Sequence, residues 1–228
     1  MERPAPVKLR ELLIAQLHER QSCTSRVLNI GAGAGDFIEN FLAANGCSFT
    51  IDRLDVDDCR VEHPNVQACY RCSVENMDVV QSDCYDLAFA NYVLEHVEDL
   101  SKAASEICRV LKPGGVFIAT VPNTTAPEFI VARHTPLWFH RLVRGGSGWE
   151  THYSYGSIPE LCAVLERAGL ETVHLFQWSC VRSYLRRFPV LKQLAVFYDW
   201  CVSHIGWKRL MGDVCLASRK SDGAAAQP

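Results

Sequence analysis

Several features that mark other classes of protein are missing from this sequence. Across its 228 residues, no stretch approaches the ~18 consecutive apolar residues that a membrane-spanning helix needs. The first residues lack the basic-then-apolar order of a secretory signal. Lysine and arginine number 23 against 26 acidic residues, which leaves no basic excess for a nucleic-acid backbone. We therefore expect a cytoplasmic protein with neither a stable membrane span nor a nucleic-acid partner.

A metal or disulfide framework is not indicated either, although the chain contains 11 cysteines. Their number is odd and they are spread along the whole chain, which is typical of reduced, buried thiols rather than of a small secreted domain. Cys69 and Cys72 have the spacing of zinc ligands, but a structural zinc site would require a second such pair. We expect no metal.

What the sequence does contain is an alternation of strand and helix patterns. Short apolar runs predict strands over 26–30, 49–56, 86–90, 116–121, 170–176 and 211–217. Apolar residues at helical spacing predict helices over 7–20, 37–44, 101–111 and 158–168, and Ser101 is the expected N-cap of the third. Strands that alternate with helices form parallel βαβ units, so the predicted fold class is α/β.

One domain is expected over residues 1–220, followed by a disordered tail at 221–228. Residues 1–24 are interpreted as a helical cap. Residues 122–155, rich in proline and glycine, are interpreted as an insertion or lid, and residues 178–210 as a helical cover for the substrate. The amphipathic stretch 181–209 also suits peripheral contact with a membrane, which covering helices explain equally well.

The densest chemical signal is a glycine turn at residues 28–36, which read LNIGAGAGD. Alternate glycines between a strand and a helix let the backbone approach a ligand closely. Asp55 ends the next strand, where an acid can accept both hydroxyls of a ribose. A dinucleotide fingerprint would need glycine where Asp36 stands, and a carboxylate there would repel a pyrophosphate. The spacing therefore favours S-adenosylmethionine over NAD.

Three further stretches follow this turn in order. Residues 82–97 read SDCYDLAFANYVLEHV, residues 106–115 read EICRVLKPGG, and residues 120–123 read TVPN. With the glycine turn, they resemble the class I S-adenosylmethionine-dependent methyltransferases, in the small-molecule branch that includes quinone-biosynthesis enzymes. The resemblance is close over 25–123. It implies a Rossmann-like, doubly wound, mostly parallel seven-stranded sheet with helices on both faces, and methyl transfer to a small molecule.

The resemblance also implies which residues meet the cofactor. The turn would pack against the methionine part, the acid after the second strand would bind the ribose, residues 73–77 would frame the adenine, and the residues after the fourth strand would follow the methionyl chain. The expected contacts are Asn29, Gly31, Ala32, Gly33, Asp55, Val56, Val74, Glu75, Asn91 and Tyr92. Asn29 and Ser73 stand where the family commonly has acids. Asp57 and Asp58 crowd Asp55, so the identity of the ribose-binding carboxylate stays open.

The catalytic candidates are His96 and His152. If the acceptor is a hydroxyl, a base must take its proton, and histidine is matched to neutral pH. The acceptor atom (oxygen, nitrogen or carbon) stays open, on an aromatic, polyketide-like, glycan or lipid-linked molecule, as does the choice between monomer and homodimer. The alternative is an inactive partner subunit with the same fold, which Asn29 and Ser73 favour and the intact glycines and Asp55 oppose.

Overall fold

The computed structural model describes residues 2–20, 24–134, 152, 154–185 and 189–221. Its strands are β1 (Ser25–Ile30), β2 (Phe49–Asp55), β3 (Val66–Arg71), β4 (Tyr85–Asn91), β5 (Leu111–Pro122), β6 (Leu170–Trp178) and β7 (Asp213–Lys220). They form one seven-stranded sheet in the order β3-β2-β1-β4-β5-β7-β6. The first five strands pair in parallel, and β7 runs antiparallel between β5 and β6. This confirms the predicted mostly parallel, doubly wound sheet.

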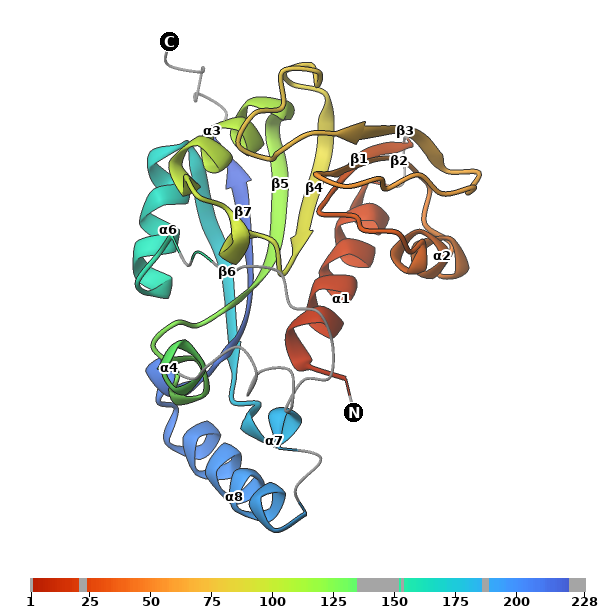
Figure 1. The fold of residues 1–228 in the computed structure, drawn as a ribbon. Helices are drawn as coiled ribbons and strands as arrows, with labels where there is room; N and C mark the ends of the chain where they lie inside the picture. Colours follow the sequence, from red (N-terminus) through yellow and green to blue (C-terminus); the bar gives the residue numbers. More distant parts are fainter. Residues whose placement is uncertain (1, 21–23, 135–151, 153, 186–188, 222–228) are drawn as a thin grey trace.

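Helices cover both faces of the sheet (Figure 1). They are α1 (Pro4–Glu19), α2 (Phe37–Ala44), α3 (Leu100–Val110), α4 (Pro127–His134), α6 (Ile158–Arg167), α7 (Val181–Tyr184) and α8 (Pro189–Ile205), with short 3-10 helices η1 (Leu94–His96) and η2 (Lys208–Leu210). No helix in the described part of the chain is long and apolar enough to cross a bilayer.

Two apolar clusters, one on each face, hold these layers together. Leu9 and Leu13 of α1 are buried with Val27 of β1 on one face, and Leu28 of the same strand is buried with α3 and α6 on the other. Successive residues of a strand point to opposite faces, so a strand covered on both sides is apolar at consecutive positions. That is why β1, β4 and β5 were recognisable as apolar runs.

The order of the strands places the predicted site. β1 lies between β2 and β4, so the chain leaves β1 in one direction along the sheet and returns on its other side. Open α/β sheets bind ligands at this reversal, outside the carboxyl ends of the strands. In Figure 1 this is the lower edge of β4 and β5, below which α4, α7 and α8 lie.

Two expectations about local structure are wrong. The apolar pattern did not locate β3, because this strand is at the sheet edge and is half-exposed, so its sequence shows no apolar run. Ser101 does not cap α3: the cap is Asp99, whose carboxylate accepts hydrogen bonds from the backbone of Ser101 and Lys102 at 3.1 Å. Since the cap side chain bonds to N–H groups two and three residues on, the helix begins one residue earlier than expected.

Candidate active site

The glycine turn adopts a conformation that only glycine takes easily. Gly31 and Gly33 have φ of 69° and 61°, in the left-handed region. A Cβ at Gly31 would overlap the side chain of Val93, so this glycine also lets the segment after β4 pack closely. A Cβ at Gly33 would meet nothing within 4 Å, which leaves open space above the turn. The backbone is therefore exposed to whatever occupies that space.

A buried ion pair supports the turn from behind. Arg53 of β2 and Glu39 of α2 are both fully buried and bonded to each other. The Arg53 guanidinium also donates to the carbonyl oxygens of Ala32, Gly33 and Gly35 at 3.1, 2.9 and 2.8 Å. Three carbonyls of the turn thus converge on one rigid, planar donor.

Asn29 belongs to the same network. Its side-chain nitrogen donates to the Glu39 carboxylate at 3.2 Å, and the side chain is buried. An aspartate at this position would place a second carboxylate against Glu39. The departure from the family pattern at Asn29 therefore has a structural cause, because the acid of this site stands on α2 instead. Sequence reasoning missed Glu39 and Arg53, although an arginine within an apolar strand pattern is a signal of a buried partner.

Asp55 is the acid that contacts the glycine turn. Its Oδ2 accepts from the backbone of Gly33 at 2.8 Å, and its Oδ1 accepts from the backbone of Asp57 at 3.0 Å. Each oxygen keeps a second lone pair, so the Asp55 carboxylate can accept hydrogen bonds from two further donors. Asp58 instead bonds to Arg60 at 2.7 Å, and this contact lowers the pKa of Asp58 to about 2. Val56, next to Asp55, is 53% exposed.

The predicted adenine stretch follows β3. Val74 is buried in the core on the side of α3 and α6. Glu75 accepts from the backbone of Glu98 at 2.7 Å, and its own backbone donates to the Ser73 hydroxyl at 3.2 Å. Ser73 therefore stabilises the local turn through its hydroxyl, where the family commonly has an acid.

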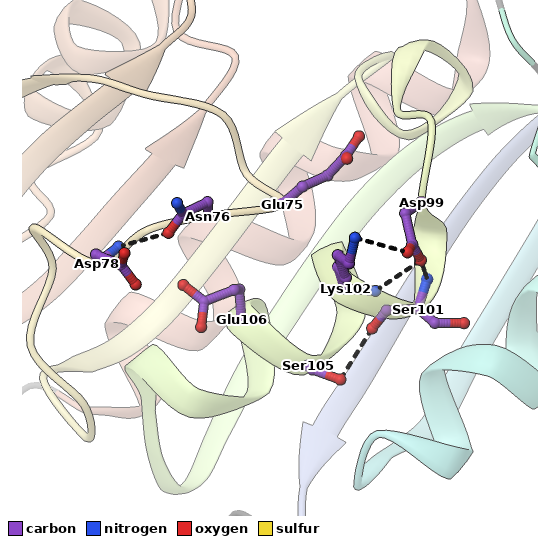
Figure 2. A pocket seen from close by; sticks show the side chains of 8 residues that line it. All are labelled: Glu75, Asn76, Asp78, Asp99, Ser101, Lys102, Ser105 and Glu106. Atoms are coloured by element: carbon purple, nitrogen blue, oxygen red, sulfur yellow. Dashed lines mark hydrogen bonds and ion pairs between the residues drawn. The ribbon is translucent and has the colours of Figure 1, made fainter.

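A cavity of about 390 Å³ opens between this stretch and the start of α3 (Figure 2). Its lining is polar, and its acids already have partners within the protein. Asp99 faces Lys102 and Ser101, and Glu106 bonds to Arg109 at 2.6 Å. No residue of the glycine turn and no residue at the end of β2 lines the cavity, so it is separate from the open space above the turn.

The residues after β4 are strained and tied to β5. Tyr92 has φ of 57°, which is unusual for a bulky residue. Its backbone N–H donates to the carbonyl and the hydroxyl oxygen of Thr120 at 3.1 and 3.0 Å, and the Thr120 hydroxyl donates to Asn91 at 2.7 Å. Strain of this kind is held only where the surroundings over-determine it, and it is common at functional sites.

The Tyr92 ring reaches from β4 to the start of β7. Its hydroxyl donates to Asp213, which is fully buried and also accepts from Arg3 at 2.5 Å and from the backbone of Ala5 at 2.9 Å. The Arg3 guanidinium stacks 4.3 Å from the centre of the Tyr92 ring. The beginning of the chain therefore closes over this edge of the sheet. Asp213 was not among the expected site residues.

The two candidate histidines lie on neighbouring segments. His96 is half-buried at the end of η1, and His152 is exposed. The backbone of His152 donates to the carbonyl of Glu95 at 3.0 Å, so a residue near the end of the predicted lid lies against η1. The lid itself was predicted over 122–155, and its residues 135–151 and 153 lie outside the described residues.

The described residues hold no group of three or more histidine, cysteine, aspartate or glutamate side chains that could bind a metal ion. The cysteines of the described part are not in disulfides. Burial raises the pKa of Cys59, beside β3, to about 11, which disfavours the thiolate that metal binding requires.

The strand order, the glycine turn with Asp55 at the end of the next strand, and the structured edge at β4 and β5 define a class I S-adenosylmethionine-dependent methyltransferase fold. Family comparison agrees, since a family model described as "Methyltransferase domain" matches residues 2–175. The chain belongs to this methyltransferase family.

Curated relatives give the same assignment, and a solved structure shows the same fold. A ubiquinone biosynthesis O-methyltransferase of Xanthomonas axonopodis pv. citri is 31% identical over 173 residues, which cover 73% of this chain and 69% of the relative. The protein of the same name from Nitrobacter winogradskyi is 30% identical over 154 residues, and the match spans 64% of this chain and only 56% of that relative. The structure of an S-adenosylmethionine-dependent methyltransferase from Mesorhizobium loti superposes with a TM-score of 0.61 at 18% identity, over 92% of this chain and 96% of that one.

S-adenosylmethionine is the cofactor of this family, and the residues present suit it. The space above Gly33 is open, and the Asp55 carboxylate has acceptor capacity for two hydroxyls. The Asp36 carboxylate at the end of the turn, which would repel a pyrophosphate, is compatible with a cationic sulfonium and ammonium.

Proposed function

We propose that this protein transfers a methyl group from S-adenosylmethionine to an oxygen of an aromatic small molecule. The observation that carries the proposal is the glycine turn facing open space with Asp55 bonded to its edge. The two relatives are named as O-methyltransferases of ubiquinone biosynthesis, which supports an oxygen acceptor on a ring. A polyketide-like, glycan or lipid-linked acceptor shares the same requirement for a nucleophile beside the sulfonium.

The test is calorimetric titration with S-adenosylmethionine and S-adenosylhomocysteine. We expect both to bind to the wild-type protein and Asp55→Ala to weaken both. Asp58→Ala is the matched control, because Asp58 is an acid of the same loop that bonds to Arg60 instead of the turn. A wild-type protein that binds neither compound, or an Asp55→Ala variant that binds as tightly as Asp58→Ala, contradicts the proposal.

Within this function, His96 and His152 are proposed as groups that face the acceptor. In-line methyl transfer depends mainly on alignment of the nucleophile, and a base matters where the nucleophile is a hydroxyl. The hydrogen bond between the backbone of His152 and Glu95 supports a shared location for the two side chains. We propose that the protein acts in the cytoplasm, as a monomer or homodimer.

A second proposal concerns the outer face of α8, which we infer to contact a membrane surface. Val190, Leu194 and Phe197 are spaced three and four residues apart and are 74%, 63% and 66% exposed. The opposite face of the helix carries the buried Ala195 and Val202. Residues 181–209 contain six lysines and arginines and one acidic residue, a charge that suits anionic lipid.

Co-sedimentation with phosphatidylglycerol vesicles tests this contact. We expect Leu194→Glu/Phe197→Glu to abolish co-sedimentation while S-adenosylhomocysteine still binds. The exposed apolar side chains of β6 provide a control, since Val173→Glu removes a comparable side chain from another surface. Equal sedimentation of both variants and the wild type contradicts the contact.

A further inference from the structure

A glutamate with a buried carboxylate, outside the residues assigned above, lies near Asp213. Glu128 is in the first turn of α4. Its carboxylate rests against Gly212, the residue before β7, so closely that a Cβ at Gly212 would overlap Oε1. Both carboxylate oxygens are buried, and neither accepts a hydrogen bond from another described residue. Such an atom costs free energy unless a ligand or a proton satisfies it.

The acids around Glu128 do not share this feature. Asp199 of α8 accepts from the Ser179 hydroxyl at 2.7 Å and from the backbone of Val181 and Arg182 at 3.0 and 3.1 Å. Asp213 accepts from Arg3, Ala5 and Tyr92. The carboxyl groups of Asp199 and Asp213 therefore have fixed hydrogen-bond donors, whereas neither carboxylate oxygen of Glu128 has one among the described residues.

The ionisable groups that face Glu128 come from four parts of the chain. They are Arg3, Cys180, Tyr198, Asp199 and Asp213. Burial, with the negative charges of Asp199 and Asp213, raises the pKa of Glu128 to about 7, against the opposing effect of Arg3. A group with this pKa can both take and return a proton near neutral pH.

We propose that Glu128 is the general base that accepts the proton of the acceptor hydroxyl, and that Gly212 positions it. The assignment rests on the proposed methyl transfer to oxygen. As the acceptor oxygen forms its bond to the methyl carbon, the O–H bond breaks and the proton passes to a Glu128 carboxylate oxygen. The carbon–sulfur bond breaks at the same time and its electron pair stays on sulfur, so that charge and atoms balance when Glu128 later releases the proton to water.

The position of Glu128 distinguishes it from the two histidines. Its carboxylate is buried against Gly212, the residue before β7, and Arg3 and Asp213 are among the charged groups that face it. His152 is exposed to solvent, where an acceptor proton could leave without a base. A base enclosed with the acceptor is effective because no water competes for the proton.

The experiment measures transfer of a labelled methyl group from S-adenosylmethionine to acceptor compounds. The acceptors tested are the small molecules extracted from the source cells and two phenols, catechol and caffeate. We expect Glu128→Gln to lower kcat/KM by ~10²–10⁴-fold and to remove the acidic limb of the pH profile, while S-adenosylhomocysteine binds normally. Gly212→Ala should lower the rate in the same way, because it displaces the carboxylate without changing its charge. Glu166→Gln, at an exposed glutamate of α6, is the matched control.

A second measurement does not depend on an acceptor. The pKa of Glu128 is followed by NMR of carboxyl-labelled protein, with Glu128→Gln to assign the signal, and an apparent value near 7 is expected. A pKa of Glu128 in the ordinary range of glutamate overturns the assignment. So does a pH profile of activity that is unchanged in Glu128→Gln but loses its acidic limb in His96→Gln. A wild-type protein that binds S-adenosylhomocysteine but labels no compound refutes the proposed function itself, and the assignment with it.

Discussion

The buried pair of Glu39 and Arg53 gives a prediction whose size follows from the structure. Arg53→Met removes the partner of a fully buried carboxylate and leaves three carbonyls of the glycine turn without their common donor. Breaking one side of a buried ion pair typically costs 3–5 kcal/mol, since the remaining charge stays buried and uncompensated. For a chain of this size we expect a loss of about 6–20 °C in Tm.

The change should also reach the cofactor. Without Arg53, the carbonyls of Ala32, Gly33 and Gly35 have no fixed partner, so the turn loses the conformation in which Gly33 bonds to Asp55. We expect S-adenosylhomocysteine to bind more weakly to Arg53→Met by at least tenfold, measured by calorimetry at a temperature where the variant is folded.

Two comparisons make this prediction refutable. Arg60→Met removes an exposed arginine from an exposed pair with Asp58, and we expect it to change the free energy of unfolding by less than about 0.5 kcal/mol. Glu39→Met/Arg53→Met should be less destabilised than Arg53→Met alone, because no unpaired charge is left. An Arg53→Met variant that is less stable but binds the cofactor product as wild type would show that the pair supports the core and not the turn.

Three further predictions concern single positions. Asn29→Asp should destabilise the protein by about 1–3 kcal/mol at neutral pH, since it replaces a hydrogen-bond donor to Glu39 by a second acid. Urea unfolding measures this loss, and Asn40→Asp, at an exposed position of α2, is the control. Because the folded-state pKa of Glu128 is raised from 4.5 to about 7, wild-type stability should fall as pH rises through this window, and Glu128→Gln should gain up to about 3 kcal/mol relative to wild type above it. His96→Ala should keep S-adenosylhomocysteine affinity and lose ~10²-fold in turnover; unchanged turnover would exclude His96 from the mechanism.

How much of the fold could be predicted depended on where each strand lies. β1 and β4 are covered on both faces, so their apolar runs gave bounds within one residue of those observed. β3 is an edge strand whose residues are half-exposed, and no periodicity separates such a segment from a loop. The same limit applies to the cap of α3. Asp99 and Ser101, two residues apart, are both suitable caps, and only the backbone geometry selects one.

The site was predictable where its residues follow one another in the chain and not where they meet across it. Gly31, Gly33 and Asp55 form a pattern of fixed spacing, and the structure brings them together. Glu128 and Asp213 come close only because α4 follows the carboxyl end of β5 and β7 begins beside it, and neither has a neighbouring motif in the sequence. An ionisable residue inside a segment expected to be a lid is the weak signal that was available.

The network at Asn29 changes how a departure from a family pattern should be interpreted. Taken position by position, asparagine in place of an acid suggests a weakened cofactor site. The structure shows that a carboxylate is present beside the same strand end, supplied by Glu39 from α2 and neutralised by Arg53. With the pair in place, an acid at position 29 would add like charge to a buried site, so the asparagine is the residue that this arrangement requires. The substitution therefore argues for a rearranged site and not for an inactive one.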